Sequence, residues 1–390
     1  MQEENISLEE LIADANDCLR RTEHSSFDRD SFPIRRRKKK KSRLNKAFTA
    51  AATAIILLLE TVLLLIGVVY GAMYVLAKGP SPTAQKLFVR SVRETSAVGF
   101  LANLFYTEAE IQQIIGSNVI PDYDETDSSL IQIPQPKPDD NKPDEPVTDA
   151  WGLTDEDGDG IIVKEVRGEG YYGYMMVILD PSRVIMGSVP ESYGSRGYTV
   201  EQMVDKFDAV AGINGGGFYD PDGKGNGSIP DTMVVYDGQI YYPENGSGRG
   251  FAGFDSNHIL HVGNFTQAQI QERDIQYGVC FGPVLVVNGE AVDPAILDSG
   301  VNPRTAIGQR SDGAVLMLVI NGRQIGSLGA TFSDLADIFL DYGAVNACNL
   351  DGGSSSMMWY NGEYVNNSAS VIGIRPIPTS FLVLKEGDHP

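Results

Sequence analysis

The chain has 390 residues, which is enough for two domains of average size or one large domain. Its formal net charge of −21 is unevenly distributed. Residues 1–46 hold 12 Lys and Arg against 9 Asp and Glu, whereas residues 78–390 hold 19 against 42. An acidic surface repels other polyanions at long range, so the composition argues against a nucleic-acid partner and a general polyanion-binding module. It leaves room for a local cationic pocket.

A long apolar stretch at residues 47–77 predicts one transmembrane helix. Its central part alone meets the roughly 20 residues that a helix needs to cross a bilayer. The basic block at 35–46 precedes it directly, so the positive-inside rule places the N-terminus in the cytoplasm and the C-terminal part outside. A cleaved signal peptide fits less well, because the stretch is too long and begins far into the chain. Glu60 lies mid-span, where it is protonated or packed against a helix, or faces a dedicated partner helix.

The order of segments predicts five regions: a cytoplasmic basic tail at 1–46, the transmembrane helix at 47–77, a helical stalk at 78–120, a Pro/Asp-rich linker at 121–150 and a globular C-terminal domain at 151–386. In the stalk, apolar residues recur with helical spacing over 84–104 and 108–115. We expect residues 150–390 to fold without the stalk, because the linker separates the two.

The C-terminal domain alternates short apolar runs with Gly-containing turns, which is typical of strands and hairpins. The predicted strands are 174–179, 232–236, 284–287, 315–320 and 380–384, and the predicted amphipathic helices are 200–209 and 331–342. This pattern indicates an α+β fold, with a mixed β-sheet core and flanking helices, preceded by one transmembrane helix.

Three polar or glycine-rich segments could carry chemistry. A loop at 213–220 contains Asn214 and three glycines, which let a backbone approach a ligand closely, although a tight turn without ligand is also open. It lacks the Lys and spacing of a P-loop. The segment 302–308 contains Arg304, whose guanidinium can bind phosphate with two hydrogen bonds or pair with a carboxylate. The segment 349–356 places Asp351 after an apolar run and before two glycines and three serines, where it could act as a base, a nucleophile or a cation ligand, or could cap an Asx-turn.

Other groups give weaker signals. The acidic run 155–160 resembles the start of a calcium loop, but Val166 stands where the bidentate Glu is required, so we expect no metal there. Four histidines occur in the chain, and no Ser-His-Asp arrangement can be built from them. Cys280 and Cys348 either form a disulfide or remain free thiols.

Taken together, five segments in order resemble the phosphodiester glycosidase family over about residues 159–384. They are Asn-Gly-Gly-Gly-Phe at 214–218, Phe-Gly-Pro-Val-Leu-Val at 281–286, Pro-Arg-Thr-Ala-Ile-Gly at 303–308, Asn-Leu-Asp-Gly-Gly at 349–353, and Arg375 with Thr379. Two departures are Gly217 before Phe218, at a position where related sequences vary, and Ser354 in place of a third glycine, and both bear on substrate shape. The membrane anchor and stalk suggest a bacterial cell-surface member.

The resemblance supports these positions, and the chemistry of the residues suggests their roles. Asp351 is the carboxylate at the anomeric carbon, as nucleophile or as base for water, while Arg304 and Arg375 hold the phosphate and Asn214 orients the sugar. Further substrate-binding residues are expected to be Gly215, Gly216, Phe218, Thr305, Asn349, Gly352, Gly353 and Ser355. A phosphate monoester is a weakly basic leaving group, so one carboxylate near C1 can suffice where ordinary glycosidases use two.

The expected function is hydrolysis of the glycosidic bond of sugar-1-phosphodiesters, of the GlcNAc-1-phosphate type, on cell-surface or extracellular glycopolymers. The expected partners are the carbohydrate phosphodiester substrate and the membrane, through the single-pass helix, and no cofactor is expected. Two other classes stay open: a non-catalytic module that binds a wall glycan or phosphopolymer, and a protein-interaction ectodomain. The expected location is the cell membrane, with the catalytic domain outside.

Overall fold

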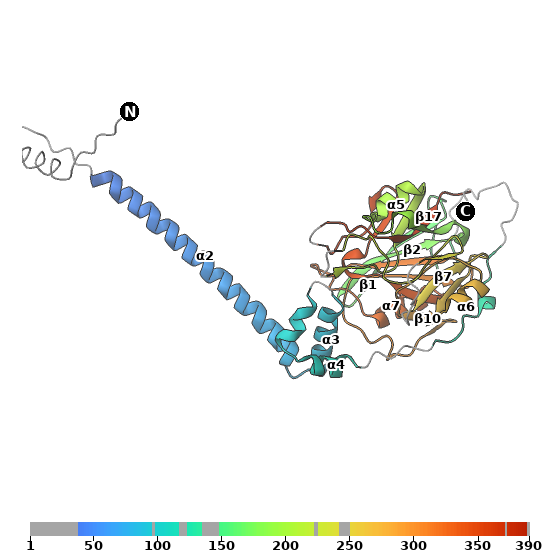
Figure 1. Ribbon diagram of the computed structural model, residues 1–390, viewed down its shortest axis with the longest axis horizontal. Helices are drawn as coiled ribbons and strands as arrows, with labels where there is room; N and C mark the ends of the chain where they lie inside the picture. Colours follow the sequence, from blue (N-terminus) through green and yellow to red (C-terminus); the bar gives the residue numbers. More distant parts are fainter. Residues whose placement is uncertain are drawn as a thin grey trace, which may run out of the picture. The chain divides into compact units, whose positions relative to one another are not determined.

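The computed structural model describes residues 38–95, 98–116, 123–134, 148–221, 225–241, 250–370 and 373–387. The chain divides into two compact units, Met1–Gly71 and Ala72–Pro390. Most of the predicted basic tail, half of the Pro/Asp-rich linker and part of the basic block at 35–46 lie outside the described residues. The described elements mix helices with several sheets, so the α+β class is confirmed (Figure 1).

A single long helix, α2 (Lys38–Lys78), contains the apolar stretch predicted to span a membrane. Residues Asn45–Lys78 form the one helix in the described part of the chain that is long and apolar enough to do so. Its large side chains, such as Leu57, Leu63 and Val68, are exposed rather than packed against protein. An apolar helix of this length without a protein core around it is suited to a lipid environment.

The largest sheet has seven strands in the order β1-β2-β13-β12-β14-β10-β11. Their bounds are β1 Ile161–Gly168, β2 Tyr171–Ile178, β13 Val315–Ile320, β12 Arg304–Arg310, β14 Ala344–Leu350, β10 Val284–Val287 and β11 Glu290–Ala291. Every strand pair described in this structure is antiparallel, which refines the mixed sheet expected from the sequence.

Strand β13 shows why the central strands read as unbroken apolar runs. Val315, Met317 and Val319 belong to the core cluster on one face of the sheet, and Leu316 and Leu318 belong to the cluster on the other face. Side chains of a strand alternate between faces, so a strand buried on both sides needs apolar residues at every position. Helix α7 (Phe332–Asp341) covers the second face with the apolar side chains Leu335, Ala336, Ile338 and Phe339.

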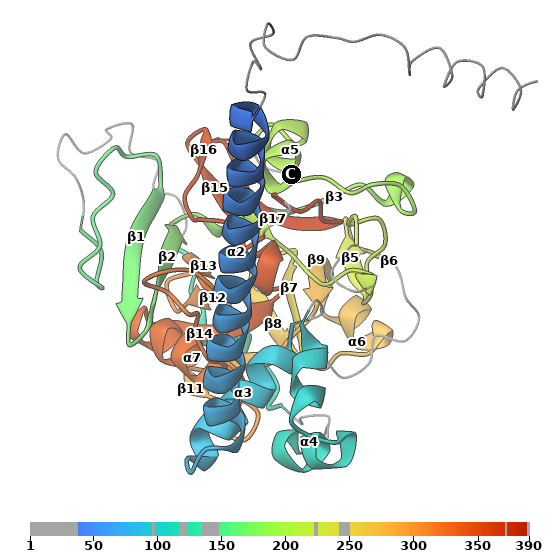
Figure 2. The same ribbon diagram turned by 90° about the vertical axis from the view of Figure 1, so that its left-hand side faces the viewer.

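Two five-stranded sheets complete the domain. The first has the order β16-β15-β4-β17-β3, with β16 Glu363–Tyr364, β15 Met358–Tyr360, β4 Ala209–Asn214, β17 Thr379–Leu384 and β3 Val184–Ser188. The second has the order β6-β5-β9-β7-β8, with β6 Gln239–Tyr241, β5 Val234–Tyr236, β9 Ile275–Cys280, β7 Phe251–Asp255 and β8 Leu260–Gly263. Helix α5 (Val200–Lys206) packs on the first sheet and α6 (Gln267–Glu272) on the second (Figure 2).

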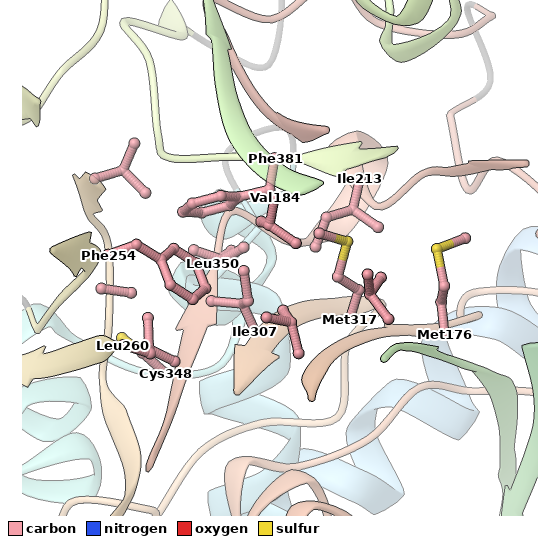
Figure 3. Close-up of a cluster of buried hydrophobic side chains, with 14 of the residues drawn as sticks. Met176, Val184, Ile213, Phe254, Leu260, Ile307, Met317, Cys348, Leu350 and Phe381 are labelled. Carbon is pink, nitrogen blue, oxygen red and sulfur yellow. The ribbon is translucent and has the colours of Figure 1, made fainter. Parts of the chain in front are cut away.

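The main core lies where the three sheets face one another. Figure 3 shows Met317 and Ile307 from the seven-stranded sheet, Phe381 from the first five-stranded sheet, and Phe254 from the second. Cys348 is part of this cluster (Figure 3), and Cys280 and Cys348 are both buried and are not joined by a disulfide. Of the two alternatives left open by the sequence, the structure has the two thiols rather than the disulfide.

The stalk packs within the same compact unit as the sheets. It consists of α3 (Pro82–Arg93), the short helix η1 (Gly99–Leu104) and α4 (Glu108–Ile115), which share a small apolar cluster around Val89, Ala102 and Ile111. The end of α3 also binds the sheet domain, because the Glu94 carboxylate accepts hydrogen bonds from Gly300 N at 2.8 Å and from Arg304 Nη2 at 2.8 Å. The stalk therefore belongs to the domain's structure.

The predicted strands and helices agree closely with the structure where the apolar pattern is strong. The predicted ranges for β10, β13 and α4 match the observed ones, and α7 is shorter by one residue at each end. The helix predicted at 200–209 ends earlier, at Lys206, because strand β4 begins at Ala209. The single stalk helix predicted at 84–104 is divided into α3 and η1.

These contacts lead us to expect that the stalk stabilises the sheet domain, in place of the independent folding anticipated from the sequence. A fragment of residues 80–390 should melt cooperatively, and a fragment of residues 150–390 should melt at a lower temperature or aggregate. In the longer fragment, Glu94→Gln should lower the free energy of unfolding by about 2–4 kcal/mol, since it leaves the buried Arg304 without its carboxylate.

Glu108→Gln is the matched control, because the Arg93–Glu108 pair is far more exposed, and its loss should cost less than about 1 kcal/mol. Denaturant unfolding followed by circular dichroism measures both changes. Equal stability of the two fragments would show that the stalk is only a spacer.

Candidate active site

The predicted catalytic carboxylate, Asp351, lies where the seven-stranded sheet meets the first five-stranded sheet. It directly follows β14, whose last residue, Leu350, pairs with Thr305 of β12. Its backbone N donates a hydrogen bond of 3.1 Å to the carbonyl oxygen of Gly215, the residue after β4. Two strand ends from different sheets are thus joined at the residue that carries the acid.

Asn214 holds this junction from the interior. Its Nδ2 donates to the backbone oxygen of Asp351 at 2.6 Å, and its Oδ1 accepts from Thr305 Oγ1 at 2.8 Å and from Met357 N at 3.1 Å. Asn214 and Thr305 are both fully buried. The Asn214 side chain thus holds the backbone of Asp351, and the Thr305 hydroxyl holds the Asn214 side chain.

The glycine loop is packed as tightly as the three successive glycines suggest. The N–H groups of Gly215 and Gly216 donate to Thr379 O at 2.9 Å and Thr379 Oγ1 at 3.0 Å. A Cβ on Gly215 would lie 2.7 Å from Thr379 Oγ1, and one on Gly217 would lie 2.6 Å from Asp231 Oδ1. Larger residues would separate these groups, so the glycines bring Asp231 and strand β17 up to the site.

The environment of Asp351 raises its pKa to about 7, chiefly because burial disfavours the charged form. The neighbouring carboxylates of Asp231 and Asp220 raise it further. A hydrogen bond from the buried Ser355 side chain and the positive charge of Arg375 lower it, without cancelling the effect of burial. Near neutral pH, Asp351 is therefore close to the midpoint between acid and base, as groups at catalytic sites often are.

Arg375 is the cation whose charge reaches Asp351, and it already has a carboxylate partner. Its Nη1 and Nη2 donate to the two oxygens of Asp220 at 2.9 and 2.7 Å, and Nη2 also donates to Gly225 O at 3.1 Å. The guanidinium carbon lies 4.8 Å from the ring centroid of the buried Phe218. Phe218, which the sequence analysis places among the substrate-binding residues, thus packs against the arginine.

Arg304 pairs with a carboxylate, which is one of the two alternatives that the sequence left open. Its side chain is 7% exposed, and its Nη2 donates to Glu94 Oε2 at 2.8 Å and to Gly300 O at 2.6 Å. Its Nε donates to Ala330 O at 3.1 Å, and its guanidinium carbon lies 4.1 Å from the ring centroid of Phe332. The guanidinium therefore contacts the stalk, and a bound phosphate would have to compete with Glu94.

The remaining predicted residues shape the loop after β14. Asn349 donates from Nδ2 to Gly282 O at 2.7 Å, and its buried Oδ1 has no partner among the described residues. A Cβ on Gly352 would lie 2.8 Å from Pro303 O. Gly353 has a φ of +63° and donates from its N to the same oxygen at 2.9 Å. Both glycines meet a backbone requirement of this turn.

Two residues near the site were not predicted. Asp231 acts electrostatically on Asp351, and the Nη2 of Arg323 lies 3.4 Å from the position that a Cβ on Gly353 would take. The sequence offers only a faint signal for Arg323, which follows the Asn-Gly turn after β13. Nothing local in the sequence marks Asp231, because its relation to the site depends on tertiary contacts.

Two other features lie apart from these residues. The oxygens of Asp155, Asp157 and Asp159 lie within 4.8 Å of one another, but they accept backbone hydrogen bonds from their own turn, including Gly158 N and Ile161 N. A hollow of about 380 Å³, lined by residues 131, 133 and 256–259, lies at the opposite end of β12 from Arg304, where Gln309 binds His258 O.

Residues 207–384, which contain β4, β14, Asp351 and Arg375, match the sequence profile of the family described as phosphodiester glycosidase. They belong to the phosphodiester glycosidase family. This family is one of glycosidases that act on phosphodiesters, so the recognition made from the five ordered segments is confirmed.

One curated relative of this phosphodiester glycosidase domain is the SPbeta prophage-derived uncharacterized protein YomE of Bacillus subtilis (strain 168), which is 32% identical over 200 residues. The alignment covers 49% of this chain and 30% of that protein, so the two share less than a third of the relative's length.

Among solved structures, the zebrafish N-acetylglucosamine-1-phosphodiester alpha-N-acetylglucosaminidase catalytic domain, auto-inhibited by its pro-peptide, is 20% identical with a TM-score of 0.48. That match covers 58% of this chain and 82% of the other. A putative exported protein of Burkholderia pseudomallei is 16% identical with a TM-score of 0.41, over 55% of this chain and 74% of the other.

The raised pKa of Asp351 has a measurable effect on stability. Because the folded state holds this proton more tightly than the unfolded state, with a pKa of about 7 against 3.8, ionisation destabilises the fold as pH rises between these values. Asp351→Asn carries no charge, so its stability relative to the wild type should increase from pH 4 to pH 8 by on the order of 2–4 kcal/mol. Denaturant unfolding at several pH values measures this difference, and a pH-independent difference would contradict the buried carboxyl.

Proposed function

We propose that the C-terminal domain hydrolyses the glycosidic bond of sugar-1-phosphodiesters, of the GlcNAc-1-phosphate type, on cell-surface or extracellular glycopolymers. The observation that carries this proposal is Asp351, a carboxyl group with a pKa of about 7 at the junction of two sheets. The family of residues 207–384 supports a phosphodiester as the class of substrate.

The proposed reaction breaks the bond between the anomeric carbon and the phosphate oxygen. Either the Asp351 carboxylate attacks this carbon and water later releases the sugar, or the carboxylate takes a proton from the water that attacks. In both cases the bonding electrons leave with the phosphate monoester, whose weak basicity reduces the need for a strong general acid. Donors and cations near the phosphate stabilise the charge that develops there.

The other predicted residues take roles that follow from their contacts. Arg375 is the predicted phosphate-binding residue whose charge acts on Asp351. A phosphate that binds to Arg375 has to replace the Asp220 carboxylate as its partner. Asn214 and Thr305 hold the Asp351 backbone in place. For Arg304, we propose a structural role at the stalk in place of phosphate binding, because Glu94 occupies its guanidinium.

A non-catalytic module that binds a wall glycan or phosphopolymer is the alternative. It is favoured by one observation: the N–H groups of Gly215 and Gly216 and the amide of Asn214 are engaged within the protein. A module of this kind would bind the polymer without using the proton equilibrium of Asp351.

We also propose that α2 anchors the protein in the cell membrane, with the N-terminus in the cytoplasm and the domain outside. The single apolar helix supports the anchor. The basic residues that precede it in the sequence support the orientation.

Catalysis by Asp351 is tested by substitution and by pH. Asp351→Asn removes the charge and keeps the shape, so kcat should fall by orders of magnitude on a sugar-1-phosphodiester that the wild type cleaves. Because the base or nucleophile must be ionised, wild-type kcat/KM should rise with pH through about 7 and then level off. Release of sugar and of phosphate monoester, followed by mass spectrometry, identifies the bond that breaks.

Glu165→Gln, on the edge strand β1, is a control that removes one carboxylate away from the junction. Near-complete turnover by Asp351→Asn would end the proposed role and direct the search to Asp220. If the wild type binds the polymer but cleaves no sugar-1-phosphodiester, the binding module is the correct alternative.

The proposed orientation predicts the result of proteolysis on intact cells. Protease added outside should cut the chain in the Pro/Asp-rich segment 134–146, which is accessible under this topology. A denaturing gel should then show a C-terminal fragment that begins near residue 146. Complete protection of the C-terminal half would place the domain on the cytoplasmic side.

A further inference from the structure

Arg323 lies against the loop that carries Asp351. Its Nη2 and Nη1 lie 3.4 and 3.5 Å from the position that a Cβ on Gly353 would take, and Gly353 is two residues beyond Asp351 in the chain. Arg323 follows β13 and is exposed. Its guanidinium is therefore at the rim of the site rather than in the core.

The three arginines near the site differ in their partners. Arg304 is paired with Glu94 and Arg375 is paired with Asp220. Arg323, in contrast, donates from Nη2 to two neutral oxygens, Thr95 Oγ1 at 2.7 Å and Asn302 Oδ1 at 3.0 Å. Within the described ranges, no carboxylate is hydrogen-bonded to Arg323, so its charge is the one most open to an added anion.

The backbone at Arg323 gives an independent indication. Its φ is +57°, in the left-handed region, which is unfavourable for most residues. The other non-glycine residues described in this region are Asp, Asn or His, which tolerate it. An Asn or Gly at position 323 would suit the turn better, and conformations of this kind cluster at ligand sites. The presence of an arginine at position 323 is therefore explained by what its side chain does and not by the backbone conformation.

The electrostatic environment agrees with this reading. Although residue 323 as a whole is exposed, neighbouring protein groups desolvate its guanidinium in part, and this desolvation and the positive charge of Arg304 lower the pKa of Arg323. The carboxylate of Glu94 opposes them only in part. A guanidinium that is partly desolvated and next to another cation is stabilised by an anion.

We propose that Arg323 binds the phosphate group of the substrate at the rim of the site, and that Thr95 of the stalk positions its guanidinium. The identity of the ligand rests on the proposed function, since a sugar bound at Asp351 carries its phosphate outward along the loop. Arg323 presents its remaining N–H donors to the phosphate oxygens, in the forked arrangement that suits this group.

The stalk contributes to the site through a short chain of hydrogen bonds. Glu94 Oε2 accepts from Asn302 Nδ2 at 3.0 Å, and Asn302 Oδ1 accepts from Arg323. Thr95 Oγ1 accepts from the same guanidinium nitrogen. Glu94 and Thr95, which follow α3 directly in the chain, thus position the Arg323 side chain that we propose binds the phosphate.

The test uses the full chain in detergent micelles, with Asp351→Asn as the background so that no turnover occurs. Calorimetry compares binding of N-acetylglucosamine 1-phosphate with binding of neutral methyl N-acetylglucosaminide. Adding Arg323→Asn should weaken binding of the phosphorylated sugar by on the order of 10- to 100-fold, and should leave binding of the neutral sugar within about twofold. Arg323→Lys should give an intermediate loss, because it keeps the charge without the fork.

Thr95→Val should weaken binding of the phosphorylated sugar by about two- to tenfold, the effect of one hydrogen bond. Arg273→Asn, at the end of α6, is the matched control and should change neither affinity. The melting temperature of Arg323→Asn should equal or exceed that of its background, because Asn suits the left-handed backbone.

Three results would overturn the proposal: no binding of the phosphorylated sugar by the background protein, equal loss for both sugars, or a lower melting temperature with unchanged affinity. The outcome is separate from that of the proposed function. If the phosphorylated sugar binds through Arg323 but the wild type does not hydrolyse a sugar-1-phosphodiester, the role of Arg323 stands and the proposed enzyme activity is rejected. If the wild type hydrolyses the substrate and Arg323→Asn does not change this, the enzyme activity stands and the role of Arg323 is rejected.

Discussion

The hydrogen bond between Asp351 N and Gly215 O joins two sheets, and the rest of the site depends on it. It forms where β14 and β4 end next to each other, and residue 215 is a glycine because a Cβ there would lie 2.7 Å from Thr379 Oγ1 of β17. Asn214 completes the junction from the interior by binding the backbone on both sides of it. The position of the acid is therefore set by main-chain contacts between sheets and not by the conformation of a surface loop.

This junction also explains the charge arrangement. Four carboxylates, those of Asp351, Asp231, Asp220 and Glu94, accompany the three arginines, and direct pairing with Asp220 and Glu94 neutralises Arg375 and Arg304. Asp231 raises the pKa of the partly buried Asp351, whose proton is held near neutral pH, and the guanidinium of Arg323 is bonded to neutral oxygens. In an acidic domain, such local pairing, more than the net charge, decides where an anionic ester can bind.

The sequence predicted the fold class, the strands β10 and β13 and the helix α4, because each has a strong apolar pattern within a few residues. It also placed Asp351 and the glycine loop at one site through their order in the chain. It could not identify Glu94 as the carboxylate partner of Arg304, because the two residues are 210 positions apart in the chain. Arg323 was missed for a similar reason, since its importance appears only when the hairpin is folded against the loop after Asp351.

Because the stalk packs on the sheets, cleavage of the segment between them does not by itself release the sheets from the membrane anchor. The segment cleaved from outside in the proposed topology lies between the stalk and the sheets in the chain, but the stalk also holds the sheets through Glu94 and Thr95. A cut there removes the covalent connection and leaves the non-covalent one. Retention at the surface then depends on the affinity between the stalk fragment and the sheet fragment. A sheet fragment that dissociates loses Glu94 and Thr95, and with them the hydrogen bond from Arg323 to Thr95.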